Sequence, residues 1–265
     1  MIQYSKPDRT SALQAKFDAL KIAFAPIIFQ VTYALWKLDI LKLISDRGNA
    51  GISAEEISKQ LKISLYGVKV LLDVGLSGKL VWLNGENYVV DKVGHFVLTD
   101  SMVQVNLNFI QDVCYQGLFD LLETIKTGKP EGLKVFGDWK TIYPALSELP
   151  PQAKKSWFEF DHYYSDKAFP EVLPIIFAKP VKELFDIGGN TGKWALECVA
   201  YNAEVHVTII DLPEQIANLK NTLDNKAMKR IDGFSANMLD PKIELPTGAQ
   251  VIWMSQFLDC FSYEE

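Results

Sequence analysis

The sequence contains few cysteines, and their arrangement excludes two kinds of stabilised protein. Only 3 cysteines occur among 265 residues, and Cys114, Cys198 and Cys260 lie in apolar-patterned segments without metal-ligand spacing. A disulfide framework or a cysteine metal centre needs paired or clustered cysteines. We therefore expect reduced thiols, a cytoplasmic location and no bound metal.

Basic residues are outnumbered by acidic ones. The chain has 27 lysines and arginines against 33 aspartates and glutamates, a net charge of −6, and an isoelectric point near 5.2. This balance gives no general attraction to nucleic acid or to an acidic membrane surface. We expect no partner of either kind.

Long apolar runs are also absent. The run at residues 22–28 contains Pro26 and is followed by Gln30, whereas a membrane-spanning helix needs about 20 apolar residues. The first nine residues lack the basic-then-apolar pattern of a signal peptide. Since 48% of the residues are hydrophobic, the sequence predicts a soluble globular protein with one or two cored domains.

Two amphipathic helices are predicted over residues 11–45, separated at Pro26. Apolar residues recur there at helical spacing, from Leu13 and Phe17 to Leu35 and Leu38. This much apolar helix near the N-terminus indicates either a homodimer interface or packing within one chain.

Residues 51–99 have the order of a winged helix-turn-helix. A capping box at Ser53–Glu56 begins one helix, Ser64 begins a second that Gly78 ends, and two strands at 80–83 and 88–90 flank an Asn-Gly turn. DNA binding is therefore an alternative function. Five lysines stand against six acidic residues between 51 and 100, and this balance favours a structural or dimerising module.

One long helix is predicted over residues 101–127, ended by Gly128. The segment from Phe136 to Phe169 is then dense in aromatic residues. Most of them fit a buried core, and some fit a pocket for an organic substrate.

The stretch at residues 181–193 organises the rest of the sequence. An apolar strand ending at Asp186 passes into a glycine-rich turn and then into a helix, and a second apolar strand, residues 205–210, ends at Asp211. This order predicts a parallel β-α-β unit whose loop and helix N-terminus face a ligand. Further strands are expected near 233–236 and 250–254, with a helix opened by Pro213 between them and Asp211.

Three ligands compete for this loop. A P-loop would need a glycine where Ile187 stands and a hydroxyl residue where Trp194 stands. A dinucleotide loop would need a residue between Gly188 and Gly189, which makes NAD a poor second. The carboxylates of Asp186 and Asp211 suit a ligand with a cationic amino acid end and a ribose diol.

The sequence resembles the S-adenosylmethionine-dependent small-molecule O-methyltransferases of the plant caffeate and hydroxyindole type. The resemblance covers most of the chain: the winged-helix region, the segment 127–130 before Phe136-Gly137, the Phe-rich helix at 157–165, and residues 186–192 against the family motif D-x-G-G-G-x-G. It implies an α/β fold, in which a mainly α winged-helix dimerisation domain precedes a Rossmann-like class I methyltransferase domain. The implied parts are residues 1–100 for dimerisation, 101–170 for a helical linker and substrate-pocket segment, and 171–265 for cofactor binding.

The resemblance also implies roles for single residues. S-adenosylmethionine would be the cofactor, a small, planar aromatic molecule would be the methyl acceptor, and a homodimer would be the assembly. Phe160 and Tyr164 would line the acceptor pocket, Tyr164 in place of a methionine. The cofactor-binding residues would be Asp186, Gly188, Gly189, Gly192, Asp211, Leu212, Asn237 and Met238.

Two departures from the family pattern bear on catalysis. Asp259 stands where the family has its histidine base, and His162 is the best histidine elsewhere. An ordinary aspartate is a weak base for a phenol, so three alternatives stay open. Burial raises the pKa of Asp259 so that it acts as the base, or the acceptor, such as an amine, needs little deprotonation. In the third alternative, the protein binds the cofactor without catalysing methyl transfer. The family's sheet also has three more strands, so we expect a complete domain to run about a hundred residues beyond Glu265.

Overall fold

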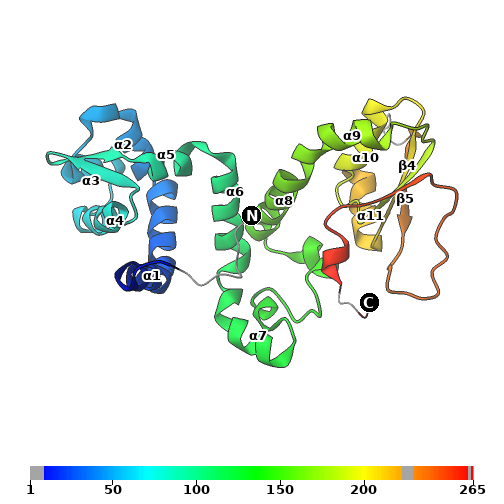
Figure 1. Ribbon diagram of the computed structural model, residues 1–265, viewed down its shortest axis with the longest axis horizontal. Helices are drawn as coiled ribbons and strands as arrows, with labels where there is room; N and C mark the ends of the chain where they lie inside the picture. The colour runs from blue at the N-terminus through cyan, green and yellow to red at the C-terminus, as the bar shows by residue number, and fades with distance from the viewer. Residues whose placement is uncertain (1–8, 223–228, 262–263, 265) are drawn as a thin grey trace. The chain divides into compact units, whose positions relative to one another are not determined.

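The computed structural model describes residues 9–222, 229–261 and 264, and it divides the chain into two compact units (Figure 1). Unit 1 comprises residues 1–107 and unit 2 residues 108–265. The finer three-part division at residues 100 and 170 stays a prediction.

Unit 1 begins with one long helix, α1 (Ala12–Lys37), which contains Pro26. The predicted break at Pro26 is therefore wrong. A proline removes one backbone donor, and the Ala- and Leu-rich residues around it continue the helix. The break lies later, where Asp39 takes a φ of 59° before α2 (Ile40–Asp46).

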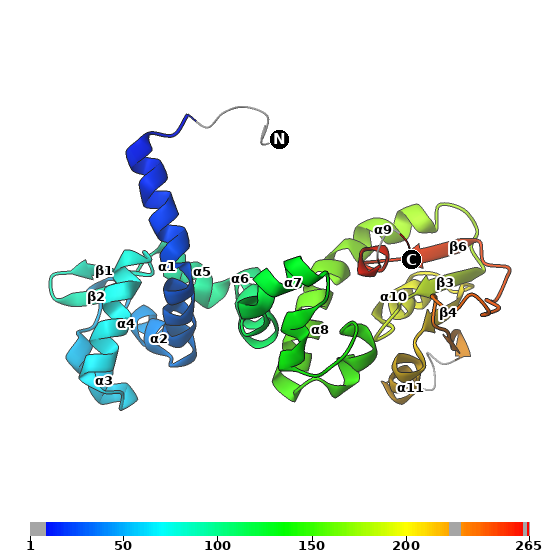
Figure 2. The same cartoon turned by 90° about the horizontal axis from the view of Figure 1, so that it is seen from below.

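The first half of α1 extends away from the rest of unit 1, as Figure 2 shows. The α1 residues Leu13, Phe17, Leu20, Phe24 and Ile27 are 44% to 66% exposed. Further along the helix Leu35 is fully buried in the core of the unit. By length and composition alone, α1 could also cross a membrane. The short apolar run at residues 22–28 did not predict this, because α1 is much longer than that run.

The middle of unit 1 follows the predicted order. Ser53 caps α3 (Ala54–Leu61) by accepting the Glu56 N–H at 3.2 Å, and Ser64 caps α4 (Leu65–Ser77) by accepting the Gly67 N–H at 3.1 Å. The hairpin consists of β1 (Val81–Asn84) and β2 (Asn87–Val90), paired antiparallel. The helices and hairpin are confirmed, and the name winged helix stays a prediction.

The single long helix predicted for residues 101–127 is wrong, because the segment after the hairpin forms several shorter elements. The chain forms α5 (Lys92–Thr99) and α6 (Ser101–Phe109), then a π-helical turn at Ile110–Cys114, a 3-10 turn at Gly117–Asp120, and α7 (Leu121–Thr127). A Cβ on Gly117 would lie 2.9 Å from the carbonyl oxygen of Gly132. This tertiary crossing, which helical periodicity does not reveal, accompanies the departure from a continuous helix.

Unit 2 contains a four-stranded parallel sheet in the order β5-β4-β3-β6. Its main core is formed by one face of the sheet, which α10 and α11 cover, together with Phe169 and Leu173 of α9. A smaller cluster contains Phe185, Ile187, Ile210 and Ala236. The strands are β3 (Glu183–Ile187), β4 (His206–Asp211), β5 (Ile231–Ser235) and β6 (Val251–Met254), and the helices are α8 (Pro151–Ser165), α9 (Phe169–Ile176), α10 (Lys193–Tyr201) and α11 (Pro213–Thr222). Shorter 3-10 turns are Gly48–Ala50, Glu131–Val135, Tyr143–Glu148, Asp166–Ala168 and Leu258–Cys260. The predicted parallel unit is confirmed.

We expect Gly94→Ala to destabilise unit 1. A Cβ on Gly94 would lie 2.2 Å from the backbone carbonyl oxygen of Leu80, so α5 and the chain before β1 must separate. The free energy of unfolding should fall by about 1–3 kcal/mol, measured by denaturant titration. Val93→Ala, on the exposed side of α5, is the matched control; equal stability of the two variants would contradict the predicted close contact.

Candidate functional site

The glycine loop connects β3 to α10 at the carboxyl edge of the sheet. Gly188 and Gly192 take φ values of 72° and 77°, which favour glycine. A Cβ on Gly188 would lie 2.5 Å from the ring of Phe257, and one on Gly189 would lie 2.6 Å from Asp186 Oδ2. Gly188 and Gly189 are therefore needed because a side chain at either position would collide with a neighbouring group, and not only because glycine is flexible.

Asp186 is the penultimate residue of β3 and lies beneath the loop, where it is 2% exposed. Its Oδ2 is buried and has no hydrogen-bond partner in the described structure. Burial, together with the negative charge of Asp211, raises the pKa of Asp186 to about 7. This carboxyl group is thus set to respond to a cationic ligand.

Asp211 ends β4 and is oriented by two backbone donors. Its Oδ2 accepts the N–H of Asn190 at 2.9 Å, and its Oδ1 accepts the N–H of Leu212 at 2.7 Å. Burial raises the pKa of Asp211, while the two hydrogen bonds act in the opposite direction. Each oxygen keeps a free lone-pair direction, so the group can accept both hydroxyls of a diol.

Asn190 occupies the loop position where the family motif has glycine. Its φ is 49°, a conformation that asparagine tolerates better than most residues. The side-chain Nδ2 donates to Asp161 Oδ2 of α8 at 3.3 Å. The next residue, Thr191, bonds His162 Nε2 at 3.2 Å. The loop is therefore tied to the helix that carries the predicted acceptor pocket.

Two cavities border the loop, both lined within unit 2. The larger has a volume of about 380 Å³, within the usual range for small-molecule sites. The smaller, of about 50 Å³, lies against Asp186, Gly189 and Trp194. Trp194 Nε1 is also buried without a partner in the described structure, and the space suits an ordered water.

The structure brings most of the predicted cofactor residues together. Asp186 and Gly189 line the smaller cavity, Gly188 lines both, and Gly192 caps α10 without lining either. The remaining predicted cofactor residues line the larger cavity: Asp211, Leu212, Asn237 and Met238.

The predicted acceptor residues behave differently from one another. Phe160 lines the larger cavity, where its ring stacks on Phe109 at 4.0 Å. Tyr164 is 44% exposed and packs on Phe160 at 5.0 Å, outside the residues that line the cavity. Sequence reasoning missed Phe109, Trp157, Asp161 and Gln215 in the lining.

Neither candidate base, Asp259 or His162, has a side chain that the structure places in the larger cavity. Asp259 lies in the 3-10 turn Leu258–Cys260 that follows β6, and its side chain lies outside the described residues. His162 bonds Thr191 and Asp166 and lines the smaller cavity, not the larger. The histidine alternative therefore lacks a position facing the larger cavity.

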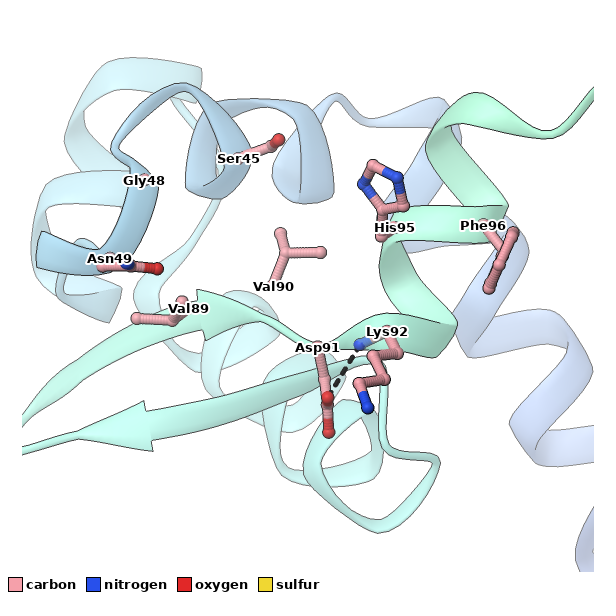
Figure 3. A pocket seen from close by; sticks show the side chains of 9 residues that line it. All are labelled: Ser45, Gly48, Asn49, Val89, Val90, Asp91, Lys92, His95 and Phe96. Carbon is pink, nitrogen blue, oxygen red and sulfur yellow. Dashed lines mark hydrogen bonds between the residues drawn. The ribbon is translucent and has the colours of Figure 1, made fainter.

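Unit 1 has a cavity of its own, of about 460 Å³, shown in Figure 3. Its lining includes Ser45, Asp91, Lys92 and His95, and Asp91 accepts the N–H of Lys92 at 2.7 Å. It is larger than the cavities of unit 2 but has neither a glycine loop nor a buried unpaired group among its described residues. The chemistry points to unit 2.

A glycine loop flanked by two carboxylates on a parallel sheet defines a Rossmann-like methyltransferase domain. Comparison with known families agrees: residues 158–265 match the O-methyltransferase domain, and residues 16–88 match the Dimerisation2-like domain. Both domain matches are those expected from the resemblance to the S-adenosylmethionine-dependent small-molecule O-methyltransferases, which is thereby confirmed. S-adenosylmethionine is the cofactor of this family.

The relatives have low sequence identity to this chain, but the matches cover most of its length. L-tyrosine C(3)-methyltransferase of Streptomyces lavendulae is 22% identical over 92% of this chain and 67% of its own length. Acetylserotonin O-methyltransferase of Gallus gallus is 24% identical over 77% of this chain and 61% of its own length. The solved structure of PigF with SAH has a TM-score of 0.68 at 19% identity, covering 90% of this chain and 72% of that one. The chain thus spans about two thirds of the length of these relatives.

The charge of Asp186 should make the stability of the ligand-free protein depend on pH. The unfolded chain releases this proton near pH 3.8, whereas the folded protein holds it up to about pH 7. The folded state binds more protons in that window, so the free energy of unfolding falls as pH rises, by up to about 4 kcal/mol.

Denaturant titrations from pH 4 to pH 7 would measure this fall. The matched control is Asp186→Asn, which cannot titrate and should lack this part of the slope. Asp211, whose raised pKa adds its own slope, is present in both proteins. Parallel pH profiles for wild type and Asp186→Asn would show that Asp186 is ionised normally.

Proposed function

We propose that the protein transfers a methyl group from S-adenosylmethionine to a small aromatic acceptor, with a hydroxyl oxygen as the receiving atom. The observation that carries the proposal is the pair of carboxylates, Asp186 and Asp211, at the glycine loop, beside a cavity with an aromatic wall. The residues fit the cofactor because a buried unpaired carboxyl oxygen and an oriented carboxylate match its cationic and diol ends.

When bound, the cofactor supplies an electrophilic methyl group on a sulfonium. The chain would hold its ribose at Asp211, its adenine between Leu212 and Met238, and its amino acid end at the glycine loop. Asn237, whose Oδ1 accepts the N–H of Leu239 at 3.0 Å, lies beside the expected base edge. The aromatic wall would hold the acceptor ring by stacking.

Proton removal from the acceptor hydroxyl is assigned to Asp259. Two observations support the assignment: Asp259 stands at the position of the family's histidine, and its neighbour Cys260, in the turn that follows β6 after three residues, lines the larger cavity. A base for a phenol needs a pKa closer to neutrality than that of an ordinary aspartate. Asp259 therefore requires a raised pKa for this role.

Replacement of Asp211 should weaken cofactor binding. The diol would lose two hydrogen bonds to a charged group, each worth about 1.5–3 kcal/mol, so Asp211→Ala should bind S-adenosylhomocysteine at least about 100-fold more weakly. Calorimetry measures this directly. Glu214→Gln, an exposed change at the start of α11, is the control. Identical binding by wild type and Asp211→Ala, or no binding by either, would disprove the proposed cofactor site.

The assembly is proposed to be a homodimer formed through unit 1. The match of residues 16–88 to a Dimerisation2-like domain supports it. So does the exposed stripe of Leu13, Phe17, Leu20, Phe24 and Ile27 on α1, whose spacing of four and three residues is that of a helix-helix seam. An aqueous interface of this kind accounts for the apolar length of α1 without a membrane.

Charge on the stripe should separate the subunits. Phe17→Glu combined with Phe24→Glu places carboxylates in the seam, so the mass measured by light scattering should fall from dimer to monomer. The control is Ala15→Glu, which adds charge on the opposite side of the same exposed helix. A dimer that survives the double change would contradict the assignment of the seam to α1.

The charge of unit 1 does not favour a DNA-binding role. Lys69, the lysine of the helix that would read DNA, pairs with Glu55 at 2.8 Å within unit 1. This pairing leaves less positive charge for phosphate contacts. The proposal includes no nucleic-acid partner, no metal and no membrane. It includes a cytoplasmic location, which is supported by three cysteines that form no disulfide.

A further inference from the structure

The larger cavity has an unbalanced charge. Asp161 and Asp211 line it, and none of its described lining residues is a lysine, arginine or histidine. The nearby Lys193 lines the smaller cavity and bonds Asp166 at 2.8 Å. Carboxylates in a concave, partly apolar site produce a negative potential that attracts cations and repels anions.

The two carboxylates lie on different sides of the site. Asp211 belongs to the sheet edge, where the proposed function gives it the cofactor's ribose. Asp161 belongs to α8, and it follows Phe160 directly in the chain. It lines both cavities and accepts the side-chain amide of Asn190. Asp161 therefore places a carboxylate at the junction of the glycine loop and the aromatic wall.

The aromatic wall beside Asp161 is built from rings that pack on one another. Phe109 stacks on Phe160 with centroids 4.0 Å apart, and Trp157 meets the ring of Phe109 at 5.7 Å. Tyr143 in turn meets Trp157 at 6.5 Å. A planar ring fits such a wall, and an ammonium group beside it would gain both from the ring faces and from the carboxylate.

A carboxylate on the acceptor would have the opposite effect. It would meet Asp161 with no cationic side chain among the described lining residues to compensate, and like charges at close range repel strongly in a partly buried site. The site therefore discriminates by charge as well as by shape.

We propose that the methyl acceptor is a planar aromatic molecule that carries a protonated amine, and that Asp161 on α8 selects this charge. The inference rests on the proposed methyltransferase function and names the acceptor class for the same site. Asp161 is a specificity residue, held in place by Asn190.

Matched ligand pairs test the charge preference. Tyramine and para-hydroxyphenylacetate share a phenol ring, and serotonin and hydroxyindole acetate share an indole ring, so each pair differs in the charged end. Calorimetry with the full chain saturated with S-adenosylhomocysteine should show at least about tenfold tighter binding of the amine in at least one pair. Equal binding, tighter binding of the acid, or no binding of either amine would overturn the proposal.

Variants of α8 assign the preference to Asp161. Asp161→Asn should reduce the amine preference at least about tenfold, and Asp161→Glu, which keeps the charge, should retain it. Glu159→Gln removes a charge from the same helix, at a residue that pairs with Lys155 outside the cavity, and should change nothing. A preference that survives in Asp161→Asn would overturn the role of Asp161.

Failure of the proposed function has a separate signature. If S-adenosylhomocysteine does not bind wild type, the cofactor assignment fails, and the same ligand pairs titrated without it still decide the charge preference. If it binds with equal affinity to wild type and Asp161→Asn while the amines and acids bind alike, the acceptor proposal alone fails.

Discussion

The close approach of the glycine loop to two carboxylates, the buried Asp186 and the half-buried Asp211, is the constraint on which the site depends. Asp186 lies under the loop with one oxygen unpaired, and Gly189 leaves no room for a side chain above it. Burying a carboxylate without a partner costs free energy unless it takes a proton or meets a cation. The ligand-free protein solves this with a raised pKa, and a cationic ligand offers the second solution.

The same loop contacts both the cofactor side and the aromatic side of the site. The Asn190 backbone N–H orients Asp211 at the sheet edge, while its side-chain amide holds Asp161 on α8. A glycine in this position could make the first contact but not the second. The substitution therefore couples the cofactor side of the cavity to its aromatic side through one residue, and the left-handed φ of Asn190 is the conformational condition for it.

Much of this arrangement could be predicted from the sequence because it depends on local rules. Capping serines, the Asn-Gly turn, and the run from an apolar strand through glycines into a helix are short patterns with direct physical causes. The elements that were predicted wrongly depend on contacts between distant residues. The helix over 101–127 departs from α geometry near the place where Gly117 crosses Gly132, and Pro26 is carried within α1 by the helix on both sides.

The site residues divide in the same way. Asp186 and Asp211 could be found because each lies at the carboxyl end of a strand, and parallel strands bring these ends to one edge. Asp161 could not, because nothing in the sequence of α8 shows that it meets the loop 29 residues later. Its position beside Phe160 was the available signal, since a charged residue within an aromatic helix is itself a reason to ask what it faces.

The relatives differ in the atom that receives the methyl group. One is named for methyl transfer to carbon and another for transfer to oxygen, so a shared cofactor fold does not determine which atom receives the methyl group. That choice depends on what the wall of the cavity places in line with the sulfonium and on which charge it tolerates there. In this chain the wall is aromatic and its adjoining charge is negative. An acceptor that satisfies both conditions needs a flat ring and a cationic substituent, and it is held by the helix that also stabilises the cofactor loop.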